Sequence, residues 1–158
     1  MAGDTLEVVS LNRERLLSES AFGRAMIGSL SDQQQALVIE NQRLTEELET
    51  EERALTETRK TMSAEEFRPL AEAFDEKVKQ VRAAQDGKAV DLAKAREAAR
   101  FSFFRRIEPV IIEIMQSRGA RVLLNNQAVL LSTDDVDITA AVLARLDALF
   151  AQGALAVE

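Results

Sequence analysis

The chain has 158 residues, and the absence of Cys and His excludes thiol catalysis, disulfides and the usual zinc sites. Its 20 basic and 27 acidic side chains give a net charge of −7, which disfavours a general nucleic-acid-binding protein. Only 6 Gly and 2 Pro interrupt a highly charged sequence, so long helices are favoured over a fold of many short strands.

Short apolar segments with the character of strands lie near both ends of the sequence. Residues 5–10 alternate weakly and predict one strand, and residues 122–124 and 128–131 predict two more. Asn125 and Asn126 predict a tight turn between the last two, because Asn tolerates positive φ. Since even an isolated pair of strands is marginally stable in water, we expect these segments to meet in a small β head.

Helical patterning begins near Arg13, although Gly23 and Gly28 weaken it, and Ser31 or Asp32 predicts the cap of a new helix. Two seven-residue registers then place apolar side chains on one stripe of a helix. The apolar members of the stripe are Leu30, Leu37, Leu44, Leu48, Leu55 and Met62. The polar residues that interrupt it are Gln34, Asn41 and Glu51.

The sequence next predicts a reversal followed by a returning helix. Ser63 and Glu66 have the spacing of a capping box, which places the tip of a helical hairpin near residues 60–63. The returning helix repeats the seven-residue pattern, beginning with Phe67 and Phe74. We therefore expect an antiparallel two-helix coiled coil, roughly 50 Å long for about 35 residues per helix.

The two helices of the predicted hairpin differ in charge. Residues 30–62 carry 4 basic and 8 acidic side chains, whereas residues 67–100 carry 8 basic and 6 acidic ones. Gly87 interrupts the returning helix and leaves two interpretations open, a bend or a glycine that is tolerated in an exposed helix.

Beyond the hairpin, residues 101–115 are apolar on several faces, which two helices alone cannot bury. This segment is expected to enter a core, with a kink at Pro109 and a C-terminal cap at Gly119. Asp137 is expected to cap a closing amphipathic helix. The apolar face of that helix is predicted to hold Ile138, Val142, Leu146 and Leu149.

The expected fold is mainly α with a small β head. Residues 1–29 and 101–158 are assigned to the head, and residues 30–100 to the coiled-coil arm. The head has too few strands to cover itself, and residues 101–115 need partners, so we expect an oligomer.

Patterns that would carry catalysis or metal binding are missing from the sequence. No Ser or Thr can pair with a His base, so we expect no catalytic residues, no cofactor and no enzyme activity. The acidic run from Glu46 to Glu52 predicts a solvated helix face, and residues 133–137 lack the Gly and distal Glu of a calcium loop. No apolar run reaches the roughly 18 residues of a membrane span, and the N-terminus lacks the pattern of a signal peptide.

Both ends of the chain resemble the Skp/OmpH family of periplasmic chaperones. Residues 121–143 carry the similarity, above all Ala128 and Val129 and the helix start at Asp137, Ile138 and Thr139. At the other end, residues 6–11 and 17–23 resemble the first strand and helix of the family.

This resemblance implies a jellyfish-shaped homotrimer in the periplasm, whose signal peptide has been removed. Short strands of three copies form a β-barrel body, and three helical hairpins surround a cavity that holds unfolded outer-membrane proteins without ATP. The best-known members of the family are strongly basic, whereas this chain is acidic, which disfavours lipopolysaccharide binding.

Two sets of residues are predicted to serve these roles. The client-binding set on the arm is Leu48, Leu55, Met62, Phe67, Phe74, Lys77, Lys79 and Arg82. The trimer-body set is Leu6, Val8, Val122, Leu124, Val129, Leu131 and Ile138. The alternative function is a structural or adaptor coiled coil that binds one folded partner through a rigid arm.

Overall fold

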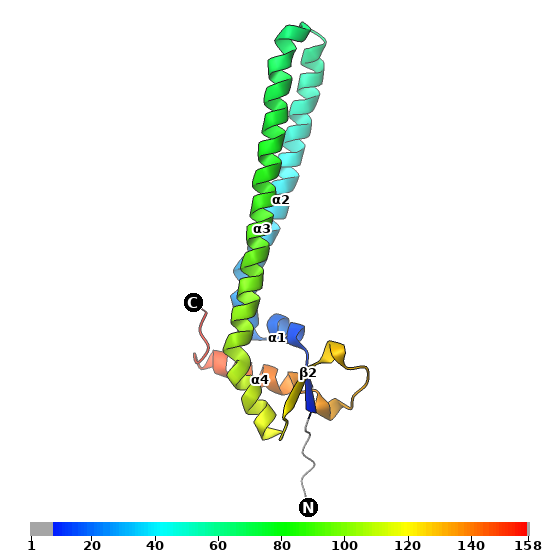
Figure 1. Cartoon of the computed structure of the whole chain (residues 1–158). Coiled ribbons are helices and arrows are strands. Elements are labelled where there is room, and N and C mark those ends of the chain that lie inside the picture. The colour runs from blue at the N-terminus through cyan, green and yellow to red at the C-terminus, as the bar shows by residue number, and fades with distance from the viewer. Residues whose placement is uncertain (1–7, 158) are drawn as a thin grey trace, which may run out of the picture. The chain divides into compact units, whose positions relative to one another are not determined.

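The structure is a computed structural model that describes residues 8–157, so Leu6 of the predicted first strand lies outside the described residues. The chain is mainly helical, with a long helical hairpin and two short strands among the described residues (Figure 1). Its elements in chain order are β1 (Val8–Leu11), α1 (Arg13–Glu19), α2 (Ala21–Arg59), α3 (Ala64–Ser117), β2 (Val122–Asn125) and α4 (Thr139–Ala151).

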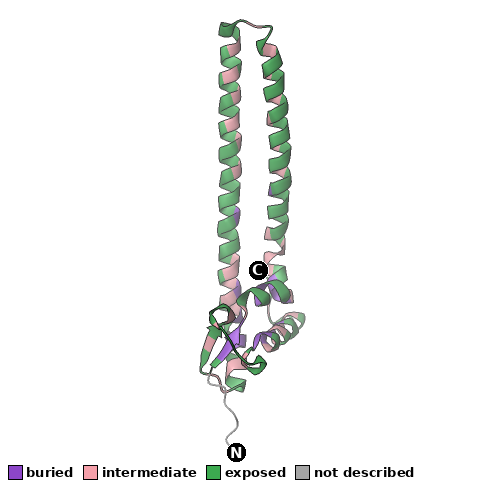
Figure 2. Ribbon diagram, turned by 90° about the vertical axis from the view of Figure 1, so that its right-hand side faces the viewer, coloured by how far each residue is buried: buried purple, intermediate pink, exposed green. Residues whose placement is uncertain are grey.

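Two compact units make up the chain, and α2 and α3 each contribute to both. The first unit comprises Met1–Ser29 and Arg96–Glu158, and we call it the head. The second comprises Leu30–Ala95, and we call it the hairpin. Buried residues gather mostly in the head, whereas the hairpin is largely exposed (Figure 2).

The two strands of the head pair in parallel. Val8 lies opposite Val122, and Leu11 lies opposite Asn125, so segments more than a hundred residues apart share a sheet. Ser10 of β1 also forms an isolated bridge with Asp137, and the Ile138 N–H donates to the Ser10 carbonyl oxygen at 2.9 Å. The prediction that the first and second apolar segments meet in a small sheet is therefore confirmed.

The predicted third strand and its tight turn are wrong. A 3₁₀ turn, Asn126–Ala128, follows β2 directly, and residues 129–133 form no strand. A two-residue hairpin turn needs positive φ, but Asn125 has φ −71° and its side chain accepts from the Gln127 N–H at 3.2 Å. This local side-chain bond starts the 3₁₀ turn instead of a hairpin.

A single apolar core holds the head together. Phe22 of α2 stacks on Phe103 of α3, with ring centroids 5.7 Å apart, and Phe150 of α4 lies 6.0 Å from Phe22. Three residues on one face of α4 and at its start are fully buried, as the sequence predicted: Ile138, Val142 and Leu146. Leu149 on the same face is partly buried against this core.

The start of α2 differs from the prediction of a new helix at Ser31 or Asp32. Ser20 separates α1 from α2, and its hydroxyl accepts from the Gly23 N–H at 3.0 Å while donating to the Leu16 carbonyl at 2.6 Å. A Cβ on Gly23 would lie 2.1 Å from the Leu17 carbonyl oxygen, so only glycine fits this corner. With its first turn fixed there, α2 continues unbroken to Arg59.

The far end of α3 closes as predicted. Gly119 has φ 69°, and the Ala120 N–H donates to the Met115 carbonyl at 2.9 Å, which is a Schellman cap. The helix passes both Gly87 and Pro109 without a break, which favours the interpretation of Gly87 as a tolerated glycine. Asp137 accepts from the Thr139 N–H at 2.8 Å just before α4, but the N-cap position is Ile138, one residue later than the sequence predicted.

Candidate functional site

The tip of the hairpin lies where the sequence placed it. Residues 60–63 separate α2 from α3. The Ser63 N–H donates to the Glu66 carboxylate at 3.1 Å, and the Glu66 N–H donates to the Ser63 hydroxyl at 3.3 Å. The Ser63 hydroxyl also donates to the Glu66 carboxylate at 2.8 Å, and this bond, followed by the one from the Ser63 N–H, lowers the pKa of the Glu66 carboxyl group below its usual value. The predicted capping box is therefore confirmed.

Two ion pairs connect α2 to α3 and fix their antiparallel register. The Lys88 ammonium lies 2.8 Å from the Glu40 carboxylate, and Lys77 pairs with Glu51. The two pairs are separated by eleven residues on each helix, from Glu40 to Glu51 and from Lys77 to Lys88. Eleven residues make about three helical turns, so both pairs lie on the same face of each helix. The hydrogen bond from Lys88 lowers the pKa of the Glu40 carboxyl group.

The seam between the two helices is shallow. Leu37 and Leu92 are buried, at 8% and 7% exposure, but the other apolar seam residues stay half-buried. Figure 2 shows this as scattered intermediate residues along two mostly exposed helices. Because each helix has only one neighbour within the hairpin, a single stripe per helix can be covered, and it is covered incompletely.

The predicted client-binding residues divide into two groups. The apolar residues are half-buried and lie on the seam: Leu48, Leu55, Met62, Phe67 and Phe74. The cationic residues are exposed, and one of them, Lys77, is engaged with Glu51: Lys77, Lys79 and Arg82. In the closed hairpin the apolar group therefore offers only part of its surface to a ligand.

Other apolar side chains of the hairpin point into solvent. Val38, Ile39 and Val90 are 55%, 62% and 51% exposed, and Leu70 is 40% exposed. They lie off the seam, because they fall between the two registers of the seven-residue pattern. They add scattered apolar contact area along the arm.

A shallow groove of about 570 Å³ runs along one face of the hairpin. Its apolar floor consists of Leu44, Leu48, Phe74, Val78 and Val81. Its charged rim consists of Glu49, Glu52, Asp75, Arg82 and Asp86. Three of the predicted client-binding residues, Leu48, Phe74 and Arg82, come together here, whereas Met62 and Phe67 line a smaller pocket at the tip with Arg59 and Arg68.

The acidic rim and the Glu40–Lys88 pair were not predicted from the sequence. From the sequence, Glu49 and Glu52 were assigned to a solvated helix face, and no role was predicted for Lys88. The missing information was the register between the helices, which the opposite charges at equal steps of eleven residues could have supplied.

The predicted trimer-body residues of the head are mostly exposed. Val8, Val122 and Leu124 on the strands are 40 to 46% exposed, and Val129 is half-buried. Leu131 is 92% exposed and its neighbour Leu130 is fully exposed, whereas Ile138 lies in the core of its own chain. Most of this set therefore remains available for contact with another molecule.

The exposed part of the head includes an apolar groove of about 580 Å³. Its apolar lining consists of Leu11, Phe101, Phe104, Ile111, Ile112, Met115, Leu123 and Leu124. Phe101 is 64% exposed and Ile112 is 44% exposed, so residues 101–115 are only partly covered within one chain. This face contains the sheet and the end of α3.

The described residues offer little for other kinds of site. Within residues 8–157, no group of three or more acidic side chains is arranged to hold a metal ion. None of the described helices combines the length and apolar character required to cross a bilayer.

Comparison with known proteins agrees with this architecture. The crystal structure of an OmpH-like protein from Caulobacter crescentus CB15, described as a candidate outer membrane chaperone, matches with a TM-score of 0.74. The match covers 90% of this chain and 84% of that one at 23% sequence identity, so it establishes a shared fold. No curated protein matches the chain in sequence.

The family comparison covers much more than half of the sequence. The model of the OmpH family, outer membrane protein (OmpH-like), matches residues 7–146. This range includes both strands, the whole hairpin and most of α4. The chain therefore belongs to the OmpH-like outer membrane protein family.

Proposed function

We propose that this protein is an ATP-independent holdase chaperone that keeps unfolded outer-membrane proteins from aggregating in the periplasm. The observation that carries the proposal is the hairpin itself, a two-helix arm with half-buried seam residues and further exposed apolar side chains. Family membership supports the chaperone role, and the candidate chaperone from Caulobacter crescentus has the same fold.

The arm suits a client without fixed structure. Val38, Ile39 and Val90 each provide a small apolar contact, and Lys79 and Arg82 provide exposed positive charge. One such contact is weak, but many of them on one long surface act together through a high effective concentration. The proposed client-binding residues remain Leu48, Leu55, Met62, Phe67, Phe74, Lys77, Lys79 and Arg82.

We extend the proposal to a homotrimer assembled through the head. The apolar groove with Phe101 and Ile112, and the exposed side chains of β2, form a surface that one chain leaves uncovered. Residues 129–131 form no strand in the single chain, and Leu130 and Leu131 are exposed. Pairing of this segment with a strand edge of another copy would cover these leucines and build the proposed β-barrel body.

Self-association is tested by light scattering of the full chain at micromolar concentration. A trimer is expected, and the variant Leu130→Ser/Leu131→Ser should weaken it without unfolding the monomer, because both side chains are exposed. The matched control is Val157→Ser, which removes another exposed apolar side chain of the head. A stable monomer for the unmodified protein would overturn the trimer.

The chaperone function is tested by diluting a urea-denatured β-barrel outer-membrane protein into buffer and recording light scattering. Suppression of aggregation at one trimer per client is expected without ATP. The variant Val38→Ser/Ile39→Ser should suppress less than the Val157→Ser control, because it removes apolar area from the arm. No suppression by the unmodified protein would overturn the proposed function.

A further inference from the structure

The groove on the hairpin combines an apolar floor with an unbalanced rim. Four carboxylates line it, from Glu49 and Glu52 on α2 and from Asp75 and Asp86 on α3, whereas Arg82 is the single cation of its lining. The acidic side chains therefore line the groove from both helices. This arrangement differs from a solvated helix face, where charges lie on one helix and point away from the partner.

The rim carboxylates are also unpaired. The ion pairs of the hairpin involve other carboxylates: Glu40 with Lys88, Glu47 with Arg43, Glu51 with Lys77, and Glu57 with Lys60. Among residues 8–157, no cation forms an ion pair with any of the four rim carboxylates. Their negative charge is therefore available to a ligand that lies in the groove.

The groove also contains a buried polar atom that lacks a hydrogen-bond partner. Gln85 lines the groove, and its side-chain oxygen is buried without a hydrogen-bond partner in the described part of the chain. A buried acceptor without a partner costs free energy, so a donor brought in by a ligand would be favourable there after a small separation of the helices.

We propose that this groove binds extended, cationic amphipathic segments of the client, in which apolar residues alternate with Lys or Arg; this inference rests on the proposed function. Strands of outer-membrane barrels alternate apolar and polar residues, so an unfolded client presents such segments. One face of the segment covers the apolar floor. The long Lys or Arg side chains of the other face bend back, with their charged ends at the rim.

Charge complementarity selects this occupant over others. An acidic amphipathic segment would have the same apolar contact but would place its carboxylates beside Glu49, Glu52, Asp75 and Asp86. Like charges brought together disfavour binding, and the effect weakens as salt screens it. The hairpin should therefore discriminate between clients by the sign of the charge that alternates with their apolar residues.

The test uses two labelled 12-residue peptides that share their apolar positions and differ only in carrying Lys or Glu at the alternating positions. Binding to the full-length protein is measured by fluorescence anisotropy at low salt. The Lys peptide should bind about three- to tenfold more tightly than the Glu peptide, as expected for several exposed charge contacts. Added salt should reduce this ratio.

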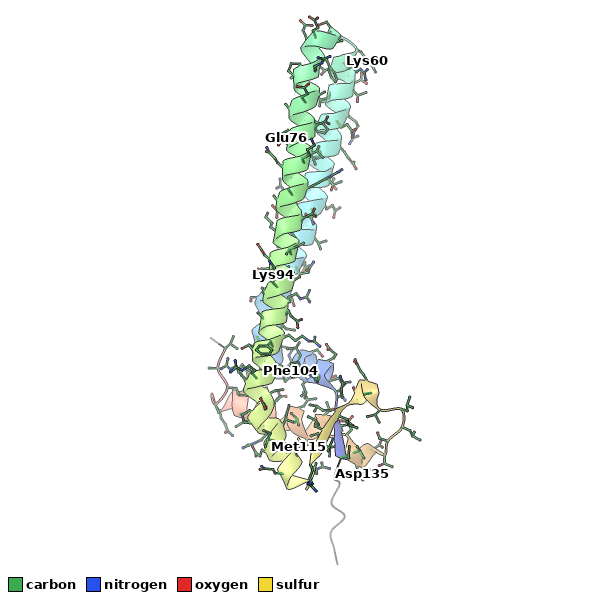
Figure 3. The ribbon with its side chains drawn as sticks, in the orientation of Figure 1. Lys60, Glu76, Lys94, Phe104, Met115 and Asp135 are labelled. Carbon is green, nitrogen blue, oxygen red and sulfur yellow. The ribbon has the colours of Figure 1, made fainter. Side chains whose placement is uncertain are left out.

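Variants then locate the effect. Two double variants are made separately: Glu49→Gln/Glu52→Gln and Asp75→Asn/Asp86→Asn. Each should bind the Lys peptide more weakly than the unmodified protein does, and should bind the Glu peptide equally well or more tightly. The matched control is Glu76→Gln, which removes a carboxylate on α3 outside the groove lining (Figure 3). A general loss of protein stability would lower the affinity for both peptides. A lower affinity for the Lys peptide alone therefore indicates loss of charge recognition in the groove.

Equal binding of the two peptides, or rim variants that behave like Glu76→Gln, would overturn the inference. Aggregation of a denatured outer-membrane protein, measured in parallel, keeps the two proposals apart. Suppression of aggregation without a preference for the Lys peptide would support the chaperone function and overturn the proposal that the groove binds cationic segments. Preference for the Lys peptide without suppression of aggregation would support binding of cationic segments in the groove and overturn the proposed chaperone function.

Discussion

The head and the hairpin use similar side chains with opposite results. In the head, Phe22, Phe103 and Ile107 are fully buried, because several elements surround them. In the hairpin, Phe67 and Phe74 are only half-buried, because one neighbouring helix covers one side. A segment with few buried contacts opens at low free energy, so we expect the hairpin to be the dynamic unit and the head to carry the global stability.

The largest expected effect comes from the core of the head. Phe103→Ala removes a ring that stacks on Phe22 at 5.7 Å and should lower the free energy of unfolding by about 3–5 kcal/mol. Phe74→Ala on the hairpin should cost clearly less, because Phe74 is half-buried. Urea unfolding of both variants measures the difference, and equal losses would contradict the comparison.

Two glycine substitutions sharpen the contrast further. Gly23→Ala in the head places a Cβ 2.1 Å from the Leu17 carbonyl and should destabilise the protein by about 1–3 kcal/mol. Gly87→Ala in the hairpin meets open space within a helix and should stabilise that helix by about 1 kcal/mol. Thermal unfolding followed by circular dichroism should move in opposite directions for the two variants.

The tip of the hairpin should respond locally to a change in its cap. Ser63→Ala removes the hydroxyl that accepts from the Glu66 N–H and should cost about 1 kcal/mol of helix stability. The expected result is faster hydrogen exchange in the first turn of α3, with the head unchanged. The control is Thr61→Ala, whose hydroxyl bonds only the carbonyl of Thr58 within the same turn.

The smallest expected effect is a dependence of the hairpin on pH. Lys88 lowers the folded-state pKa of Glu40, so this pair contributes stability above the unfolded-state pKa and loses it as pH falls through the folded-state value. The exposed pair is screened by salt. When pH is lowered, the protection of the hairpin from hydrogen exchange should change less in Glu40→Gln than in the unmodified chain. An identical change in both would contradict a contribution of the Glu40–Lys88 pair to stability.

Local patterns explain what could be predicted from the sequence. The tip depends on a capping box four residues long, and the buried face of α4 depends on a helical period, so both are visible without knowledge of the fold. The start of α2 could not be predicted in this way. Gly23 counted against a helix, yet the close approach of the Leu17 carbonyl requires it.

The errors and omissions concern partners that are distant in the sequence. Residues 128–131 have the composition of a strand, but no strand within residues 8–157 pairs with them. The acidic rim combines Glu49 and Glu52 of α2 with Asp75 and Asp86 of α3 in one groove, and this combination depends on the register between the two helices. Local composition therefore identifies the helices and their caps, but it does not show whether a strand-like segment has a partner or which charged side chains share a groove.

The most direct measurement is hydrogen exchange of the full-length protein with and without an unfolded outer-membrane β-barrel protein. Without client, residues 30–95 should exchange faster than the core of the head around Phe22 and Phe103. With client, protection should rise along residues 30–95 and stay unchanged in that core. A hairpin as protected as the head before client is added, or one whose exchange does not respond to client, would contradict a flexible client-binding arm.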